Sequence, residues 1–191
     1  MSKIALLLTP GFADWEYAYI AGIGGPFYGL DVQFFALEPG DLTSQGGLAA
    51  HVTAAASEIE AFAPNVLAVI GGMIWDSAAA PDVSAPLKAQ IAAGGTVAGI
   101  CGGTLALARA GLLDEVAHTS NAADLLAEGV PAYAGAAHYV DSPRAIVAGQ
   151  IITAPGTAAG SFAACIFTAA GLDADTTDQF RAMLAAEHTA A

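Results

Sequence analysis

The chain has 191 residues, which is enough for one domain with a substantial core, and we predict a single domain over residues 1–191. Eighteen acidic residues against five Lys and Arg give a formal net charge of −13, which excludes nucleic acid and anionic membrane surfaces as good partners. No apolar run is long enough to span a bilayer, and the run at 4–8 is too short for a secretory signal, so we expect a cytoplasmic protein without membrane attachment.

Strands and helices are predicted to alternate along the whole chain. Apolar runs predict strands at 3–8, 31–37, 66–70, 96–100, 116–121, 138–141, 145–147 and 150–153, with a hairpin or edge excursion at 46–54. Helical spacing predicts helices that begin near 14, 82, 103, 122 and 177, and a further helix that includes 162–169. This alternation indicates an α/β fold of the doubly wound type, a mostly parallel sheet with helices on both faces.

Two boundary signals concern the first predicted helix. Asp14 is placed to cap it, and Glu16 then lies in its first turn, just beyond the C-terminal end of the first strand. Ligands bind at that edge of an open α/β sheet. By spacing alone, however, Glu16 is more simply an acid that complements the helix dipole. The glycines at 22–25 and Pro26 are expected to end or loosen this helix.

The run from Thr96 to Leu107 is the strongest chemical signal. It combines a buried strand, a turn with the pattern Gly99-x-Cys101-x-Gly103, and a helix, which is the nucleophile-elbow pattern with cysteine in place of serine. Glycine on both sides removes side chains that would collide with the strand or the helix. Cys101 would then lie at a helix N-terminus, where backbone N–H groups favour the reactive thiolate.

A simpler interpretation of Cys101 is a buried, inert cysteine in an ordinary glycine-rich turn. We favour the reactive interpretation because strand, both glycines and helix occur together. The second cysteine, Cys165, lies on an apolar helical stripe and is interpreted as core. The four histidines show no metal-ligand spacing with the two cysteines, and neither a phosphate loop nor a dinucleotide fingerprint is found. We therefore expect no metal and no cofactor.

Four blocks of sequence carry a resemblance to a known family. They are 3–8 with 11–16, 71–75, 99–104, and 151–157 running to 161–162. Through them the chain resembles the ThiJ/PfpI superfamily over nearly its full length. That superfamily is similar in fold to class I glutamine amidotransferase domains, which is a flavodoxin-like architecture. It includes intracellular protease-like proteins, isocyanide hydratases, glyoxalase or deglycase-type enzymes and the parkinsonism-associated redox protein.

The resemblance gives roles to residues that spacing alone leaves open. It implies that Glu16 lies beside Cys101 and hydrogen-bonds it, often as a protonated carboxylic acid, and a carboxyl group buried next to a thiolate should have a raised pKa. It also implies that the backbone N–H groups of Gly72 and Gly102 form an oxyanion hole. Asp14, Trp75, Asn121 and His118 are further candidates for the wall of the substrate pocket. Relatives commonly form homodimers, which we expect here too.

The sequence departs from the family pattern at the base. In the protease-like branch a histidine follows the cysteine, but here Gly102 does, and Asn121 stands where other branches carry a histidine after the next strand. A strand would point His118 to the opposite face from Asn121. Peptidase activity is therefore not expected. Chemistry that needs only a thiolate and an acid remains open.

These observations support three hypotheses. The first is a cysteine-dependent small-molecule hydrolase, hydratase or glyoxalase-type enzyme, with Cys101 as nucleophile, Glu16 as proton partner and a small-molecule substrate. The second is a redox-sensing stress-response protein in which Cys101 is oxidised without true turnover. The third is a catalytically silent fold that binds partners.

Overall fold

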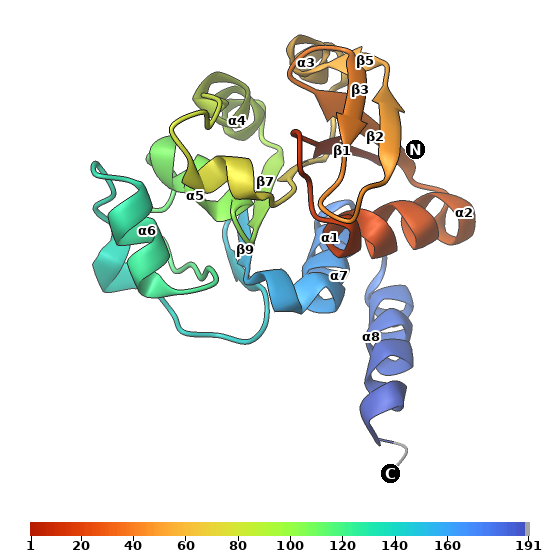
Figure 1. The fold of residues 1–191 in the computed structure, drawn as a ribbon. Helices are drawn as coiled ribbons and strands as arrows, with labels where there is room; N and C mark the ends of the chain where they lie inside the picture. Colours follow the sequence, from red (N-terminus) through yellow and green to blue (C-terminus); the bar gives the residue numbers. More distant parts are fainter. Residues whose placement is uncertain (190–191) are drawn as a thin grey trace.

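The computed structural model describes residues 1–189, and it forms the alternating strands and helices that the sequence predicts (Figure 1). The strands are β1 (Lys3–Leu7), β2 (Asp31–Ala36), β3 (Gly40–Thr43), β4 (Ala49–Val52), β5 (Ala54–Ala55), β6 (Val66–Val69), β7 (Thr96–Ile100), β8 (Ile146–Ala148) and β9 (Ile151–Ala154). The α-helices are α1 (Asp14–Tyr19), α2 (Gly25–Tyr28), α3 (Ile59–Phe62), α4 (Ser84–Ala92), α5 (Gly103–Arg109), α6 (Ala123–Gly129), α7 (Ala159–Ala169) and α8 (Ala174–Thr189). Shorter helical turns are η1 (Ile20–Gly24), η2 (Ala56–Glu58), η3 (Met73–Asp76), η4 (Gly135–His138) and η5 (Gly156–Ala158).

Seven strands form one sheet in the order β5-β2-β1-β6-β7-β9-β8. Every neighbouring pair is parallel except β8 and β9, which are antiparallel. The mostly parallel, doubly wound sheet confirms the predicted fold class. In this order β1, β6, β7 and β9 occupy the centre, and the loops that follow these four strands carry the segments discussed below.

The sheet separates two hydrophobic layers because its central strands are buried on both faces. Ile4 and Leu6 of β1 belong to one core cluster, whereas Ala5 and Leu7 belong to the other. The first layer is completed by side chains of α1 and α7, and the second by side chains of α4 and α5. Successive side chains of a strand point to opposite faces of the sheet, so a strand covered by helices on both faces contributes alternate residues to each layer.

The first helix does not end at its glycines. It passes from α1 through η1, a π-helical segment, into α2 and ends at Tyr28. Gly24 faces α7 so closely that a Cβ there would lie 3.0 Å from a ring carbon of Phe167. Gly24 therefore lets α7 approach this helix, and the helix is loosened into a π-helical turn at η1 without ending there. The predicted cap is wrong in detail, since Asp14 is the first helical residue and its side chain makes no cap hydrogen bond.

Two predicted strands are absent from the described residues. The segments 116–121 and 138–141 meet only at an isolated parallel bridge between His118 and Tyr139. Both segments are irregular, and apolar side chains from each pack against the second core layer. The apolar pattern that predicted strands there therefore reflects burial of these side chains and not pairing in a sheet. The hairpin or edge excursion expected at 46–54 is a hairpin, but it begins earlier, at residue 40, because β3 pairs with β4 in antiparallel fashion.

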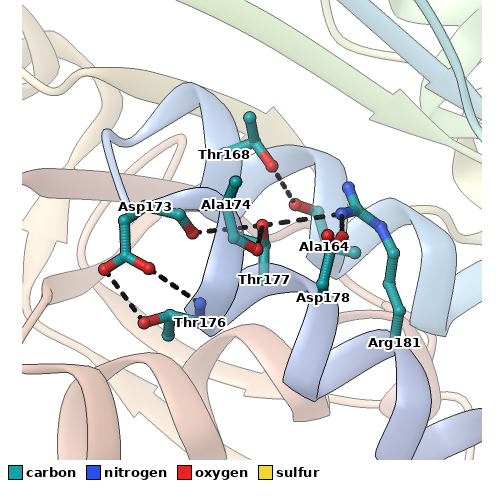
Figure 2. A network of polar contacts seen from close by, with 8 residues as sticks. All are labelled: Ala164, Thr168, Asp173, Ala174, Thr176, Thr177, Asp178 and Arg181. Carbon is teal, nitrogen blue, oxygen red and sulfur yellow. Dashed lines mark hydrogen bonds and ion pairs between the residues drawn. The ribbon is translucent and has the colours of Figure 1, made fainter.

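The last helix, α8, extends away from the sheet in Figure 1 and is joined to α7 by a short turn. Figure 2 shows the contacts at this turn: Asp173 accepts hydrogen bonds from the backbone N–H and the hydroxyl of Thr176, and Arg181 contacts Asp178. Phe180 is buried against Phe167 of α7. None of the helices in the described part of the chain is long and apolar enough to cross a lipid bilayer.

Candidate active site

Cys101 occupies a strained turn between β7 and α5. Its φ angle is +55°, in the left-handed region that non-glycine residues seldom adopt. Hydrogen bonds hold the residue there: its N–H donates to the carbonyl of Ala154 over 2.9 Å, and the hydroxyl of Thr104 donates to its carbonyl over 2.6 Å. A conformation of this kind costs free energy, and surrounding contacts must fix it.

The flanking glycines let strand and helix approach one another. A Cβ added at Gly103 would collide with the backbone oxygen of Val69 on β6, and one at Gly99 would lie 3.0 Å from the carbonyl oxygen of Gly103. This is the steric situation that the Gly-x-Cys-x-Gly pattern predicts. The turn therefore depends on both glycines, whatever chemistry the cysteine performs.

Glu16 is fully buried and lies beside Cys101. Its Oε2 accepts a hydrogen bond from the N–H of Gly71 over 2.7 Å, whereas Oε1 has no hydrogen-bond partner. A Cβ on Gly71 would come within 2.6 Å of Oε2 and 2.8 Å of the Cβ of Cys101, so both side chains border the same point. Burial raises the pKa of Glu16 to about 7, although the Gly71 hydrogen bond opposes this effect.

The pKa of the Cys101 thiol is raised by some of its surroundings and lowered by others. Burial, followed by the negative charge of Glu16, raises its pKa above the ordinary value, while hydrogen bonds from Asn121 and from the backbone of Gly102 lower it. The backbone N–H that follows the cysteine does favour the thiolate, as the sequence suggests, but burial and the neighbouring carboxylate outweigh it. Ionisation of either Cys101 or Glu16 therefore opposes ionisation of the other.

Asn121 contacts the sulfur directly. Its Nδ2 donates to Cys101 Sγ over 3.1 Å, and its Oδ1 accepts the N–H of Gly156 over 2.8 Å. The residue lies in the loop between the His118 bridge and α6.

The two glycines expected to form an oxyanion hole lie close together. A Cβ on Gly102 would come within 2.8 Å of the carbonyl oxygen of Gly72. Gly72 also bridges Phe12, and the N–H of Ala13 donates to the carbonyl of Gly71 over 3.0 Å. The loop after β6 is therefore anchored to the loop after β1, next to the cysteine.

Three of the expected pocket residues lie elsewhere. Trp75 is fully buried in the second core layer, and its Nε1–H donates to the carbonyl of Ile70. His118 is fully buried and contacts the Tyr133 hydroxyl over 2.6 Å, because the turn of the chain places its ring inward. Asp14 accepts the N–H of Gly46 over 2.7 Å and so binds the turn of the β3–β4 hairpin. None of them lines the pocket at Cys101.

A pocket of about 490 Å³ opens at the sulfur. The residues that line it are Trp15, Cys101, Asn121, Pro155, Gly156 and Thr157. Trp15 is half-exposed, and its Nε1–H donates to the carbonyl of Gly156 over 2.8 Å. Sequence reasoning assigned the aromatic wall to Trp75 and overlooked Trp15, although its place directly before Glu16, at the C-terminal edge of the sheet, is a usable signal.

A larger cavity of about 630 Å³ lies at the opposite edge of the sheet, between α3 and α4. Its lining includes Asn65 and Thr96, which stand before or at the start of β6 and β7, whereas Cys101 follows β7. Cys101 therefore does not line the larger cavity. Among the described residues, no group of three or more His, Cys, Asp or Glu is arranged to hold a metal ion.

The solved structures most relevant here share the whole architecture. A DJ-1 superfamily protein from Agrobacterium tumefaciens is 34% identical, superposes with a TM-score of 0.91, and the match covers 98% of this chain and 100% of that one. A ThiJ/PfpI family protein from Bacillus anthracis is 26% identical with a TM-score of 0.79, over 100% of this chain and 92% of that one.

Sequence comparisons give the same answer. The chain is 30% identical over 172 residues to "Uncharacterized protease YoaZ" of Bacillus subtilis (strain 168), which covers 84% of this chain and 80% of the relative. The family model described as "DJ-1/PfpI family" matches residues 2–169. With the elbow cysteine, the neighbouring glutamate and the doubly wound sheet, these matches show that the chain belongs to the DJ-1/PfpI family.

Proposed function

We propose that the protein is a cysteine-dependent enzyme that acts on a small molecule with an electrophilic carbon, within the range of hydrolase, hydratase and glyoxalase-type reactions. Cys101 is the nucleophile and Glu16 its proton partner. The observation that carries the proposal is the buried Glu16 carboxyl group, whose Oε1 has no other hydrogen-bond partner beside a cysteine that opens into a pocket. A buried oxygen without a hydrogen-bond partner lowers the stability of the fold, so its presence calls for an explanation, and a role in catalysis provides one.

The proposed reaction moves one proton. Glu16 takes the proton from the thiol, the sulfur adds to the substrate carbon, and the electron pair of the C=O bond moves to oxygen. In this proposal the N–H groups of Gly72 and Gly102 stabilise that oxygen, and Glu16 returns the proton to it. A general acid–base group works best when its pKa is near the working pH, and about 7 fits this requirement.

The pocket favours an uncharged substrate of modest size. Its volume is about 490 Å³, and none of the described residues that line it carries a Lys, Arg, Asp or Glu side chain. The net charge of −13 adds a long-range field that disfavours anions. An aldehyde, amide or isocyanide of a few heavy atoms meets both conditions.

The test compares wild type, Cys101→Ser and Glu16→Gln with methylglyoxal, a small amide and an isocyanide as substrates. We expect Cys101→Ser to abolish turnover and Glu16→Gln to lower kcat by about 10²–10⁴-fold. Glu16→Gln should at the same time speed alkylation of Cys101 by iodoacetamide at pH 7, because it removes the negative charge that raises the thiol pKa. Full activity of Cys101→Ser on every substrate would refute the proposal.

The name of the B. subtilis relative includes the word protease, but we do not extend that activity to this chain. Gly102 follows the cysteine, and the side chain that contacts the sulfur on the pocket side is Asn121, which is no base. We expect no cleavage of casein or of fluorogenic peptides at enzyme concentrations that turn over the small substrates.

Oxidation sensing is a second candidate, and the same carboxyl group favours it. A protonated Glu16 Oε1 would donate to an oxygen of a Cys101 sulfinate, formed when two equivalents of peroxide each transfer one oxygen to the sulfur. Mass spectrometry after graded peroxide distinguishes the two: uptake of two oxygen atoms at low peroxide, with no turnover of any substrate, would favour sensing.

The homodimer and the cytoplasmic location stay predictions, and sedimentation of the purified protein checks the first.

A further inference from the structure

Trp15 presents an aromatic surface to the pocket without a free hydrogen-bond donor. The residue is 47% exposed and lines the pocket. The only polar atom of its side chain, Nε1, donates a hydrogen bond to the carbonyl of Gly156 over 2.8 Å. This bond also fixes the ring, because it ties a side chain of α1 to the loop that follows β9. A ligand in the pocket therefore meets carbon atoms of an indole that is held in place.

The indole is held one residue away from the reacting sulfur. A Cβ added to Gly156 would lie 3.1 Å from Sγ of Cys101 and 3.3 Å from Oε1 of Glu16, so the chain at Gly156 runs close beside both groups. The same Gly156 accepts the N–H of Trp15. A substituent on a carbon that is bonded to the sulfur therefore comes within reach of the indole.

The other polar groups of the pocket wall are largely engaged within the protein. The amide of Asn121 donates to Cys101 Sγ and accepts the N–H of Gly156, so both its nitrogen and its oxygen are hydrogen-bonded. The carbonyl of Pro155 accepts a backbone N–H. Few groups of the wall are therefore available to select a polar substituent, whereas contact with Trp15 selects a flat apolar one.

We propose that Trp15 determines specificity, and that the preferred substrate carries an aromatic group next to the carbon that Cys101 attacks. This inference rests on the proposed function and refines it: the reacting group stays an uncharged aldehyde, amide or isocyanide, and an aryl substituent beside it packs on the indole. Aromatic pairs gain free energy beyond the burial of their surface, and a ring that is already fixed loses little entropy when the substituent binds.

Two alkylating reagents test the contact without any turnover. Iodoacetamide and N-benzyl-2-iodoacetamide share one reacting carbon: the Cys101 thiolate attacks it, an S–C bond forms, and iodide leaves with the electron pair. The aryl preference is the rate constant of the second reagent divided by that of the first, measured by mass spectrometry on the peptide that contains Cys101. Glutathione gives its intrinsic value. We expect the wild-type preference to exceed that of glutathione by about 10-fold. Equal preferences would overturn the inference, and this comparison needs no variant.

Variants at residue 15 separate the ring contact from the hydrogen bond. Trp15→Ala should lose the preference, a fall of about 10-fold, whereas Trp15→Phe keeps a ring without the N–H and should stay within about 3-fold of wild type. Phe27→Ala is the matched control and should equal wild type, because Phe27 is an aromatic residue, 77% exposed, that does not line the pocket. An unchanged preference in Trp15→Ala would overturn the inference.

Turnover assays keep this inference apart from the proposed function. The ratio of kcat/KM for phenylglyoxal to that for methylglyoxal should fall about 10-fold in Trp15→Ala, and so should the ratio for benzamide to acetamide. Turnover with the same ratios in both proteins would leave the proposed function standing and refute the role of Trp15. An aryl preference in alkylation, without turnover of any of these compounds, would refute the proposed function and retain Trp15 as the residue that selects aromatic ligands at Cys101.

Discussion

At the scale of single residues, the buried carboxyl group that Glu16 contributes to the proposed chemistry also affects the stability of the fold. Its carboxyl group is fully buried, accepts one hydrogen bond from Gly71 and leaves one oxygen unpaired. Its pKa of about 7 exceeds the ordinary value of 4.5, so the folded chain binds this proton more tightly than the unfolded chain does. The stabilisation is fully present below pH 4.5 and is lost as the pH rises to about 7.

Glu16→Gln should therefore stabilise the fold at alkaline pH. The difference between about 7 and 4.5 corresponds to about 3 kcal/mol, which is the most that the variant should gain over wild type at pH 8. At pH 4 both proteins hold a neutral group here, so their unfolding free energies should nearly coincide. Urea unfolding at both pH values measures this, and an equal difference at pH 4 and pH 8 would contradict the assigned pKa.

Gly103 of the elbow and the surface residue Gly22 should respond differently to replacement by alanine. A Cβ at Gly103 overlaps a backbone oxygen of Val69, and neither atom has a side chain's freedom to move, so Gly103→Ala should cost about 3 kcal/mol or more. Gly22 is exposed, and a Cβ there would meet nothing within 4 Å, so Gly22→Ala should be neutral or slightly stabilising. Thermal unfolding of the two variants compares them directly; similar melting temperatures would refute the close approach of α5 to β6.

At the scale of elements, the β3–β4 hairpin supports the segment that leads into α1. The N–H of Gly11 donates to the carbonyl of Thr43, and the N–H of Gln45 donates to that of Phe12. Asp14 adds a third contact through Gly46, and the hydroxyl of Ser44 is the main cause that lowers the pKa of its carboxyl group. The hairpin thus holds the residues that directly precede Trp15 and Glu16.

Loss of the Asp14 carboxylate should loosen both the hairpin and the site. Asp14→Ala removes the partner of Gly46 N–H, so amides of residues 40–52 should exchange about 5-fold faster, and kcat should fall several-fold without loss of the fold. Asp14→Asn retains an oxygen acceptor and should behave like wild type in both assays. Hydrogen-exchange mass spectrometry gives the first quantity, and unchanged exchange in the alanine variant would show that the hairpin is held by its other contacts.

Most of the elements followed from local pattern, and the errors have identifiable physical causes. The elbow was predictable because Gly99, Cys101 and Gly103 report a steric constraint within five residues. Trp75 and His118 were misplaced because a short turn decides whether a side chain faces the pocket or the core, and apolar environment alone does not distinguish these directions. The orientation of Asn121 depends on Gly156, which lies 35 residues further along the chain, so sequence spacing carried no information about it.

At the scale of the whole molecule, the acidic surface should make stability depend on salt. The chain carries a net charge of −13, with five Lys and Arg to offset eighteen acids, and like charges repel one another more strongly in the compact state than in the unfolded chain. Added salt screens that repulsion, since the Debye length falls from about 30 Å at about 0.01 M to about 3 Å at about 1 M.

We therefore expect the melting temperature to rise as NaCl increases from about 0.01 M to about 1 M, with most of the gain below about 0.2 M, where screening of exposed charges changes fastest. Sucrose at matched osmolality is the control, because it stabilises without screening. A melting temperature that is flat or falls over the same salt range would show that surface repulsion is a minor part of the folding free energy.

The sheet ends in β5 and β8, and these outer strands are two and three residues long. The unpaired N–H and carbonyl groups of an edge strand can form hydrogen bonds with another protein chain. A strand of two or three residues has very few such groups. A sequence in which 55% of residues are hydrophobic could otherwise join sheet to sheet during refolding. The short edge strands β5 and β8 therefore limit intermolecular strand pairing, and with it the growth of fibres, at high protein concentration.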